Sequence, residues 1–292
     1  MSFTIKELEL LSGVKAHTIR IWEQRYGFIK PARTTTNIRR YSNDELKTLL
    51  TVALLNKHGF KISRIDEMTP EQREEAALDL PGEASDERKV NELIHHMIQL
   101  EIETFEKIIN RIISEKGLDE CITSIIFRFL EKTGILWHTG RINPGHEHIV
   151  SNLIRQKIIS ATDQLQVTRK KNMQFLLLLP EYEYHELGLL FVHYILKKKG
   201  FQVIYMGSAT PLPDANYVID LKKPDYIYIH LTSVPIKLNL ERYISRLSIP
   251  TDSQLLLSGS AMQTRKFKRK KTVVFKSLKE LLNFLSVVNP SH

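Results

Sequence analysis

The residues best suited to chemistry follow a short apolar run. Residues 174–179 predict a buried strand, and Glu183, His185 and Gly188 come directly after it. A carboxylate two positions before a histidine is placed to hold one ring nitrogen, which fixes the tautomer and orientation of a metal-binding imidazole. His185 is therefore a candidate metal ligand. The residues alone leave open that it is an incidental polar residue of a loop.

A second kind of chemistry is suggested by basic residues between positions 15 and 40, where Glu23 is the single acid. With a formal net charge of +9, the chain is expected to have an anionic partner. A helix over residues 15–25 would offer side chains to the major groove of DNA and turn Ile19 and Trp22 to the core. The predicted DNA-binding residues are Lys15, His17, Thr18, Arg20, Arg33, Thr34, Thr35, Asn37, Arg39, Arg40 and Tyr41.

These residues need a compact helical frame. Thr4 is a suitable N-cap for a helix over residues 5–11, and Ser12-Gly13-Val14 predicts a turn into the next helix. The polar stretch from Phe28 to Tyr41 is typical of a wing, and Ser42 would cap a third helix through Leu55. A fourth helix begins near Lys61. The order predicts a winged helix-turn-helix.

The composition and the apolar periodicity of the sequence change twice in the middle of the chain. The acidic stretch over residues 69–85 lacks apolar periodicity and is expected to be a linker with at most a helical turn. From Asp86 to Leu165 apolar residues recur with a helical period, which predicts a bundle of about four helices. The single cysteine, Cys121, falls in this pattern, where a buried inert thiol is favoured over a redox role.

The C-terminal part alternates strands with helices, which predicts a doubly wound parallel sheet with ligands at the carboxyl ends of its strands. The expected strands cover residues 174–179, 201–206, 226–230, 254–257 and 272–275, and the expected helices cover 184–199, 213–222 and 278–287. We predict a DNA-binding domain (1–75), a linker (76–85), a helical bundle (86–170) and a sheet domain (171–292).

Composition agrees with a folded, multidomain chain. Of its 292 residues 42% are hydrophobic and 26% charged, and no run approaches the ~20 apolar residues that span a bilayer. The first residues do not show the pattern of a secretory signal, so we expect a cytoplasmic location and no membrane partner. A second basic cluster at residues 265–271 is favoured as a solvated loop, and contact with DNA is left open.

The N-terminal residues closely resemble the MerR family of regulators. The resemblance is carried by Thr4-Ile-Lys-Glu-Leu, by residues 13–27 (Gly-Val-Lys-Ala-His-Thr-Ile-Arg-Ile-Trp-Glu-Gln-Arg-Tyr-Gly) and by Asn37-Ile-Arg-Arg-Tyr-Ser42. It implies a symmetric dimer that reads a near-palindromic operator in double-stranded DNA. Metal-sensing members use C-terminal cysteines, which this sequence does not have, so metal sensing is not expected.

The segment around His185 resembles cobalamin-binding domains, whose pattern is Asp-x-His-x-x-Gly followed by Ser-x-Leu and Gly-Gly. The resemblance implies a Rossmann-like, flavodoxin-like domain with His185 as lower axial ligand to cobalt and Glu183 as its orienter. It also implies Ser233 as a partner of the displaced nucleotide base and Gly259 as a close-approach site for the nucleotide tail. Glu183 replaces the aspartate and Ser260 the second glycine, and either change could weaken or abolish binding.

Trp137, nine intervening residues and then Glu147-His148 resemble a motif of light-responsive, adenosylcobalamin-binding MerR regulators of the CarH/LitR type. The resemblance implies that Trp137, Glu147 and His148 pack around the adenosyl group and that His138 ligates cobalt once that group is lost. From the residues of the bundle alone, a place for Trp137 in the bundle core, with His146, Glu147 and His148 as a polar cluster at a helix start, is favoured.

Three hypotheses follow for the whole chain. The first is a repressor controlled by adenosylcobalamin and light, in which the cofactor favours a dimer or tetramer on the operator. The second is a regulator of the same architecture that works without a cofactor. The third is a corrinoid-dependent enzyme subunit, which would leave the winged domain unexplained.

Overall fold

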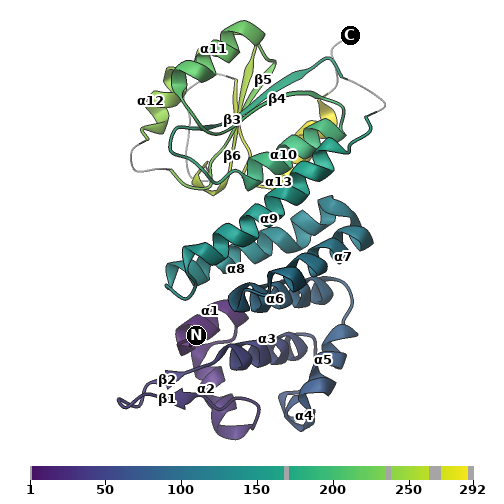
Figure 1. Cartoon of the computed structure of the whole chain (residues 1–292), viewed down its shortest axis with the longest axis vertical. Helices are drawn as coiled ribbons and strands as arrows, with labels where there is room; N and C mark the ends of the chain where they lie inside the picture. Colours follow the sequence, from purple (N-terminus) through teal and green to yellow (C-terminus); the bar gives the residue numbers. More distant parts are fainter. Residues whose placement is uncertain (1, 168–170, 235–237, 263–270, 289–292) are drawn as a thin grey trace. The chain divides into compact units, whose positions relative to one another are not determined.

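Capped helices form the N-terminal part of the chain in the computed structural model, which describes residues 2–167, 171–234, 238–262 and 271–288. Thr4 and Ser42 each begin a helix with a capping box, which satisfies two N–H groups that would otherwise lack partners. The predicted winged helix-turn-helix is confirmed (Figure 1). Its elements are α1 (Ile5–Ser12), α2 (Ala16–Arg25), β1 (Ala32–Arg33), β2 (Arg39–Arg40), α3 (Asn43–Lys57) and α4 (Ile62–Glu67).

The acidic stretch that was expected to be a linker is largely helical. Helix α5 (Pro70–Leu78) begins with a capping box between Thr69 and Gln72 and has proline in its first turn, where its missing N–H costs nothing. Helix α6 already begins at Glu83, so four residues, 79–82, lie between the two helices. The prediction of a linker with at most a helical turn over residues 69–85 is therefore wrong in its secondary structure, because local capping outweighs the weak apolar periodicity.

The expected helical bundle is present as four long helices. They are α6 (Glu83–Gln99), α7 (Ile102–Glu120), α8 (Phe127–His138) and α9 (Pro144–Asp163), and a π-helical segment, Cys121–Ile126, joins α7 to α8. Phe105 and Phe129 pack in its interior with ring centroids 5.3 Å apart. Cys121 is buried, and burial raises the pKa of its thiol to about 12, which agrees with an inert thiol.

A five-stranded parallel sheet forms the C-terminal part, with strand order β4-β3-β5-β6-β7. The order matches the predicted flavodoxin-like winding. Helix α12, which lies between β5 and β6, was not expected. The strands are β3 (Gln174–Pro180), β4 (Gln202–Thr210), β5 (Tyr226–His230), β6 (Gln254–Ser258) and β7 (Thr272–Val274); the helices are α10 (Leu187–Lys198), α11 (Leu212–Lys222), α12 (Leu240–Ser245) and α13 (Leu278–Val287).

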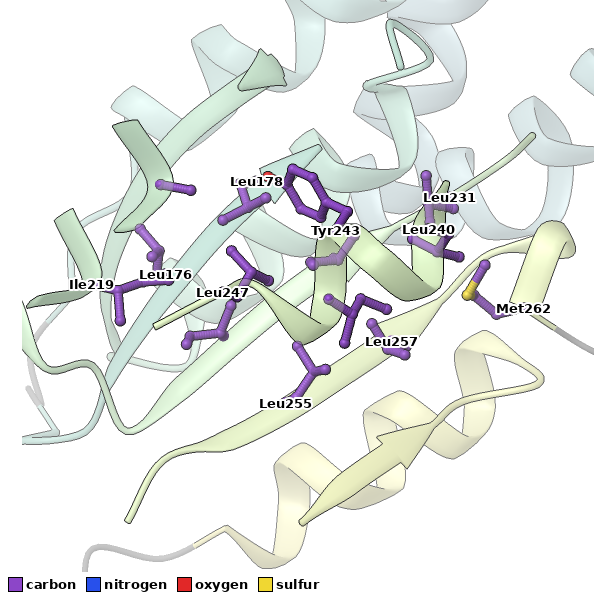
Figure 2. Packing of buried hydrophobic residues seen from close by; sticks show 14 residues of the cluster. Leu176, Leu178, Ile219, Leu231, Leu240, Tyr243, Leu247, Leu255, Leu257 and Met262 are labelled. Atoms are coloured by element: carbon purple, nitrogen blue, oxygen red, sulfur yellow. The ribbon is translucent and has the colours of Figure 1, made fainter. Parts of the chain in front are cut away.

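Each face of this sheet is covered by helices, with α11 and α12 on one side and α10 and α13 on the other (Figure 1). Figure 2 shows the α11–α12 side, where Leu176, Leu255 and Leu257 from the strands meet Ile219 and Tyr243 from the helices. Because side chains alternate along a strand, Tyr228 and His230 of β5 point to the opposite side. That side contains the candidate site described below.

The chain divides into two compact units, residues 1–153 and 154–292, and the division falls inside α9. Among the residues that the structure describes, no helix is long and apolar enough to cross a membrane.

Candidate functional site

The second helix of the helix-turn-helix presents the predicted base-contacting side chains outward. His17 and Arg20 are exposed, Thr18 is half-buried, and Ile19 and Trp22 are buried, as their helical spacing predicts. Lys15 stands just before α2, and its ammonium group lies 3.3 Å from the carboxylate of Glu9. The helix is thus anchored on one face and offers donors on the other.

One carboxylate on this helix holds the wing. Glu23 Oε2 accepts from Arg39 Nε at 2.6 Å, and Glu23 Oε1 lies 3.2 Å from Arg33 Nη2. Arg33 also donates to Asn37 Oδ1 at 2.8 Å, across the turn between β1 and β2. The hydrogen bond that Arg39 donates to Glu23 raises the pKa of Arg39. The wing arginines are therefore held in place relative to the recognition helix.

The remaining predicted residues of the wing divide into exposed and core positions. Thr35 and Asn37 are exposed, and Thr34 and Arg40 are half-buried. Tyr41 has no exposed surface, its backbone pairs with Phe3, and its hydroxyl donates to Glu23 at 3.4 Å. The prediction that Tyr41 contacts DNA is contradicted, because this ring anchors the end of the wing in the core; burial raises its pKa to about 12.

In the helical bundle the last turn of α8 displays aromatic side chains. Trp137 is 49% exposed, and its ring centroid lies 5.0 Å from that of His138, which is also exposed. A place for Trp137 in the bundle core is therefore excluded. In the first turns of α9, Glu147 accepts from Ser151 Oγ at 2.8 Å, and the side chain of His148 is 73% exposed. An exposed tryptophan beside polar groups is available to pack against a flat ligand.

At the sheet, the spacing of Glu183 and His185 produces the predicted hydrogen bond. Glu183 Oε1 accepts from His185 Nδ1 at 2.6 Å and from the His185 backbone N–H at 2.9 Å. Burial would raise the pKa of Glu183, but these bonds outweigh it, and the pKa lies below its usual value. The carboxylate is 1% exposed, whereas the imidazole is 62% exposed. A donating Nδ1 makes Nε2 the ligating atom for a metal.

Ser233 lies beside the same carboxylate. Its N–H and hydroxyl donate to Glu183 Oε2 at 3.3 and 3.4 Å. The residue comes after β5 and Glu183 after β3, so the two groups meet where neighbouring parallel strands end. This edge lies beside the reversal of strand order at which doubly wound sheets bind ligands.

His230 is a residue of this edge that sequence reasoning missed. Its Nδ1 lies 2.8 Å from Ser258 Oγ, which is also hydrogen-bonded to the hydroxyl of Tyr228. Desolvation lowers the pKa of His230 to about 4, so the ring is neutral at pH 7. The available signal was a histidine at the end of the otherwise apolar and aromatic strand Tyr226–His230.

Gly188 and Gly259, the two predicted glycines, each lie close to other atoms of the chain itself, where a Cβ would not fit. A Cβ at Gly188 would lie 2.4 Å from His230 Nε2, so only glycine leaves room for that ring. Gly259 has a φ of +100°, and a Cβ there would lie 2.1 Å from the carbonyl oxygen of Leu231. Ser260, which replaces a glycine of the expected pattern, donates to Thr232 O at 2.7 Å.

Comparisons with known proteins match the helix-turn-helix region and the helical bundle to two known families. Residues 3–72 match the family described as MerR HTH family regulatory protein, and residues 90–160, within α6–α9, match the family described as B12 binding domain. The chain thus combines a MerR-type DNA-binding region with a B12-binding domain.

It is homologous to two curated repressors of Myxococcus xanthus. It is 24% identical to the HTH-type transcriptional repressor CarH over 263 residues, which cover 87% of each chain. It is 26% identical to the HTH-type transcriptional repressor CarA over 230 residues, which cover 78% of this chain and 75% of CarA. Its fold is similar to that of the Methanosarcina barkeri monomethylamine corrinoid protein, with a TM-score of 0.54, 10% identity and coverage of 69% of this chain and 98% of that one.

The residues at the sheet edge fit the axial side of a corrinoid. An exposed imidazole, held through Nδ1 by a buried carboxylate, is suited to bind a metal through Nε2. The departure of Glu183 from the aspartate of the expected pattern does not prevent this hydrogen bond. Beside it, the space next to Gly188 is filled by His230.

Proposed function

We propose that the chain is a transcriptional repressor whose affinity for operator DNA is controlled by adenosylcobalamin and by light. The observation that carries the proposal is the Glu183–His185 hydrogen bond, because it prepares a metal ligand in a chain that also has a MerR-type DNA-binding region. Residues 1–75 would be the DNA-binding module and residues 86–292 the sensing part. The protein would act in the cytoplasm as a dimer or tetramer on a near-palindromic operator.

The residues of this chain have separate roles in the proposal. His185 Nε2 would bind cobalt, and Glu183, which accepts from Nδ1, would hold the imidazole in the orientation that leaves Nε2 for the metal. Trp137, Glu147 and His148 would contact the adenosyl group, and His138 would become a ligand after that group is lost. When bound, the cofactor supplies a cobalt–carbon bond that light breaks. The protein responds because its assembly states bind the cofactor with different affinities.

On the DNA side, Arg20 and His17 would face the major groove, and Arg33, Arg39 and Arg40 would contact phosphates. These arginines set position on the duplex, whereas the helix reads sequence. Binding would weaken steeply with salt, since each phosphate contact releases a counterion.

The test uses the full chain and adenosylcobalamin in the dark. We expect a bound-corrinoid absorbance spectrum, an increase in mass by analytical ultracentrifugation and tighter operator binding, all reversed by illumination. His185→Ala should lose the spectral signature of imidazole ligation, and His58→Gln, at an exposed histidine with no proposed role in cofactor binding, serves as the control. No bound corrinoid with wild-type protein, together with unchanged operator binding, would favour a cofactor-independent regulator instead.

A further inference from the structure

The end of α8 fixes the position of Arg141. Gly140 has a φ of +66°, its N–H donates to Trp137 O at 2.9 Å, and the Arg141 N–H donates to Leu136 O at 2.9 Å. These two bonds form a Schellman motif, which ties the residues after a helix to its last turn. The backbone of Arg141 therefore moves with the turn that carries Trp137 and His138.

The side chain of Arg141 holds the helix-turn-helix. Its Nε donates to Glu7 Oε1 at 2.5 Å, and its Nη1 donates to Ser2 O at 3.2 Å. The Glu7 side chain is 7% exposed, and its other oxygen accepts the N–H of Thr4 at 2.6 Å in the capping box of α1. A charge-assisted bond in such a shielded place is strong and geometrically specific. Arg141 and Thr4 thus share the carboxylate of Glu7, which lies 134 positions before Arg141 in the sequence.

The contacts continue from this carboxylate to the wing. Phe3, which lies between Ser2 and Thr4, pairs with Tyr41 through backbone hydrogen bonds of 2.7 and 3.0 Å, and neither side chain is exposed. Tyr41 follows β2, and its hydroxyl donates to Glu23, the carboxylate that holds Arg33 and Arg39. Every step between the last turn of α8 and the wing arginines is a hydrogen bond or a chain neighbour.

We propose that Arg141 couples the last turn of α8 to the DNA-binding surface. A ligand that contacts Trp137 or His138 shifts this turn, and Arg141 passes the shift to α1 and the wing. The identity of that ligand rests on the function proposed above, but the contacts lie wholly within residues 2–153. Because coupling between two binding sites is reciprocal, DNA binding must also change the last turn of α8.

The first measurement needs no cofactor. Amide hydrogen exchange of residues 134–142 is followed in the full chain with and without a duplex that wild-type protein has selected from random-sequence DNA. We expect DNA to change this exchange in wild type and in Arg128→Gln, a control that removes an exposed pair of α8 with Glu83. In Arg141→Gln the change should be absent while DNA still binds. Equal changes in Arg141→Gln, or none in wild type, would overturn the proposal.

A double variant guards against a folding defect, since Arg141→Gln leaves the buried Glu7 without its cation. Glu7→Gln combined with Arg141→Gln removes both charges and should show the same loss of coupling.

The second measurement adds adenosylcobalamin in the dark. Arg141→Gln should keep the bound-corrinoid spectrum, whereas the ratio of operator affinities with and without cofactor should fall by at least about fivefold. An unchanged ratio contradicts the proposal. If wild type binds no corrinoid, the cofactor assignment fails, and the hydrogen-exchange result alone decides the role of Arg141.

Discussion

Two carboxylates, Glu23 in α2 and Glu183 after β3, position basic side chains in the two regions, in different surroundings. Glu23 is 12% exposed and holds two guanidinium groups, of Arg33 and Arg39. Glu183 is 1% exposed and holds one imidazole, of His185. In both regions the basic group remains accessible to a partner while the acid is shielded.

The two carboxylates differ in the kind of basic side chain that they orient. Arginine is always charged, so Glu23 fixes the positions of two positive charges that can contact phosphates. Its own negative charge offsets part of the positive electrostatic potential of these arginines. Histidine titrates, and a carboxylate on Nδ1 keeps Nε2 directed outward as a ligand. One arrangement suits an extended anionic surface, whereas the other suits a single metal atom.

The largest effect should come from breaking the more deeply buried arrangement. Glu183→Gln removes the charge that orients His185 and also faces Ser233. We expect affinity for adenosylcobalamin, measured by absorbance titration, to fall about 10- to 100-fold. Glu23→Gln is the control and should leave this affinity unchanged. Wild-type affinity in Glu183→Gln would show that the imidazole needs no orienting carboxylate.

The sheet region should lose stability in acid. Desolvation lowers the pKa of His230 to about 4, below its unfolded value, so between these values the unfolded chain binds more protons and stability falls as pH falls. We expect His230 alone to lower the opening free energy of β5, from hydrogen exchange corrected for intrinsic rates, by about 2 kcal/mol between about pH 7 and pH 5.

His193 adds to the same trend, since desolvation lowers its pKa to about 4 as well. His230→Gln should therefore flatten the pH dependence without abolishing it, whereas His148→Gln, which alters an exposed side chain, should leave it intact. An equal slope in His230→Gln would contradict the neutral, desolvated state of His230.

On the DNA side the effect should be smaller and of another kind. Glu23→Gln frees Arg33 and Arg39, so total attraction to DNA rises while positional order is lost. We expect the salt dependence of binding to steepen by about one counterion and the preference for operator over random DNA to fall about tenfold. Glu74→Gln changes the charge equally but pairs with Lys47, to which no DNA contact is assigned, so it should keep the preference.

Local features of the fold were predictable where residues act on near neighbours. The caps at Thr4 and Ser42, the bounds of β5 and α13 and the Glu183–His185 bond all follow from spacings of a few residues. The parallel sheet followed from strands that alternate with helices. These features need little information from distant parts of the chain.

The features that were not predicted depend on contacts between distant segments or on sequence patterns of only a few residues. The bond between Arg141 and Glu7 and the placement of His230 against Gly188 join distant segments that no spacing relates. Helix α12 is short, and an Asn239 cap with Leu240, Tyr243 and Ile244 buried is its whole signal. The basic cluster at residues 265–271 lies outside the described residues except for Lys271, so its contact with DNA stays open.

The smallest effect on DNA binding is expected for Tyr41→Phe. Variants of Tyr41 test whether this residue packs in the core or contacts DNA. Tyr41→Phe removes only a 3.4 Å hydrogen bond to Glu23 and keeps the buried ring, so operator affinity should stay within about twofold of wild type. Tyr41→Ala should instead lower the free energy of unfolding by about 3–5 kcal/mol, because it leaves a cavity beneath the wing. Urea unfolding and DNA titration of both variants distinguish the roles: a direct DNA contact would make Tyr41→Phe bind much more weakly at unchanged stability.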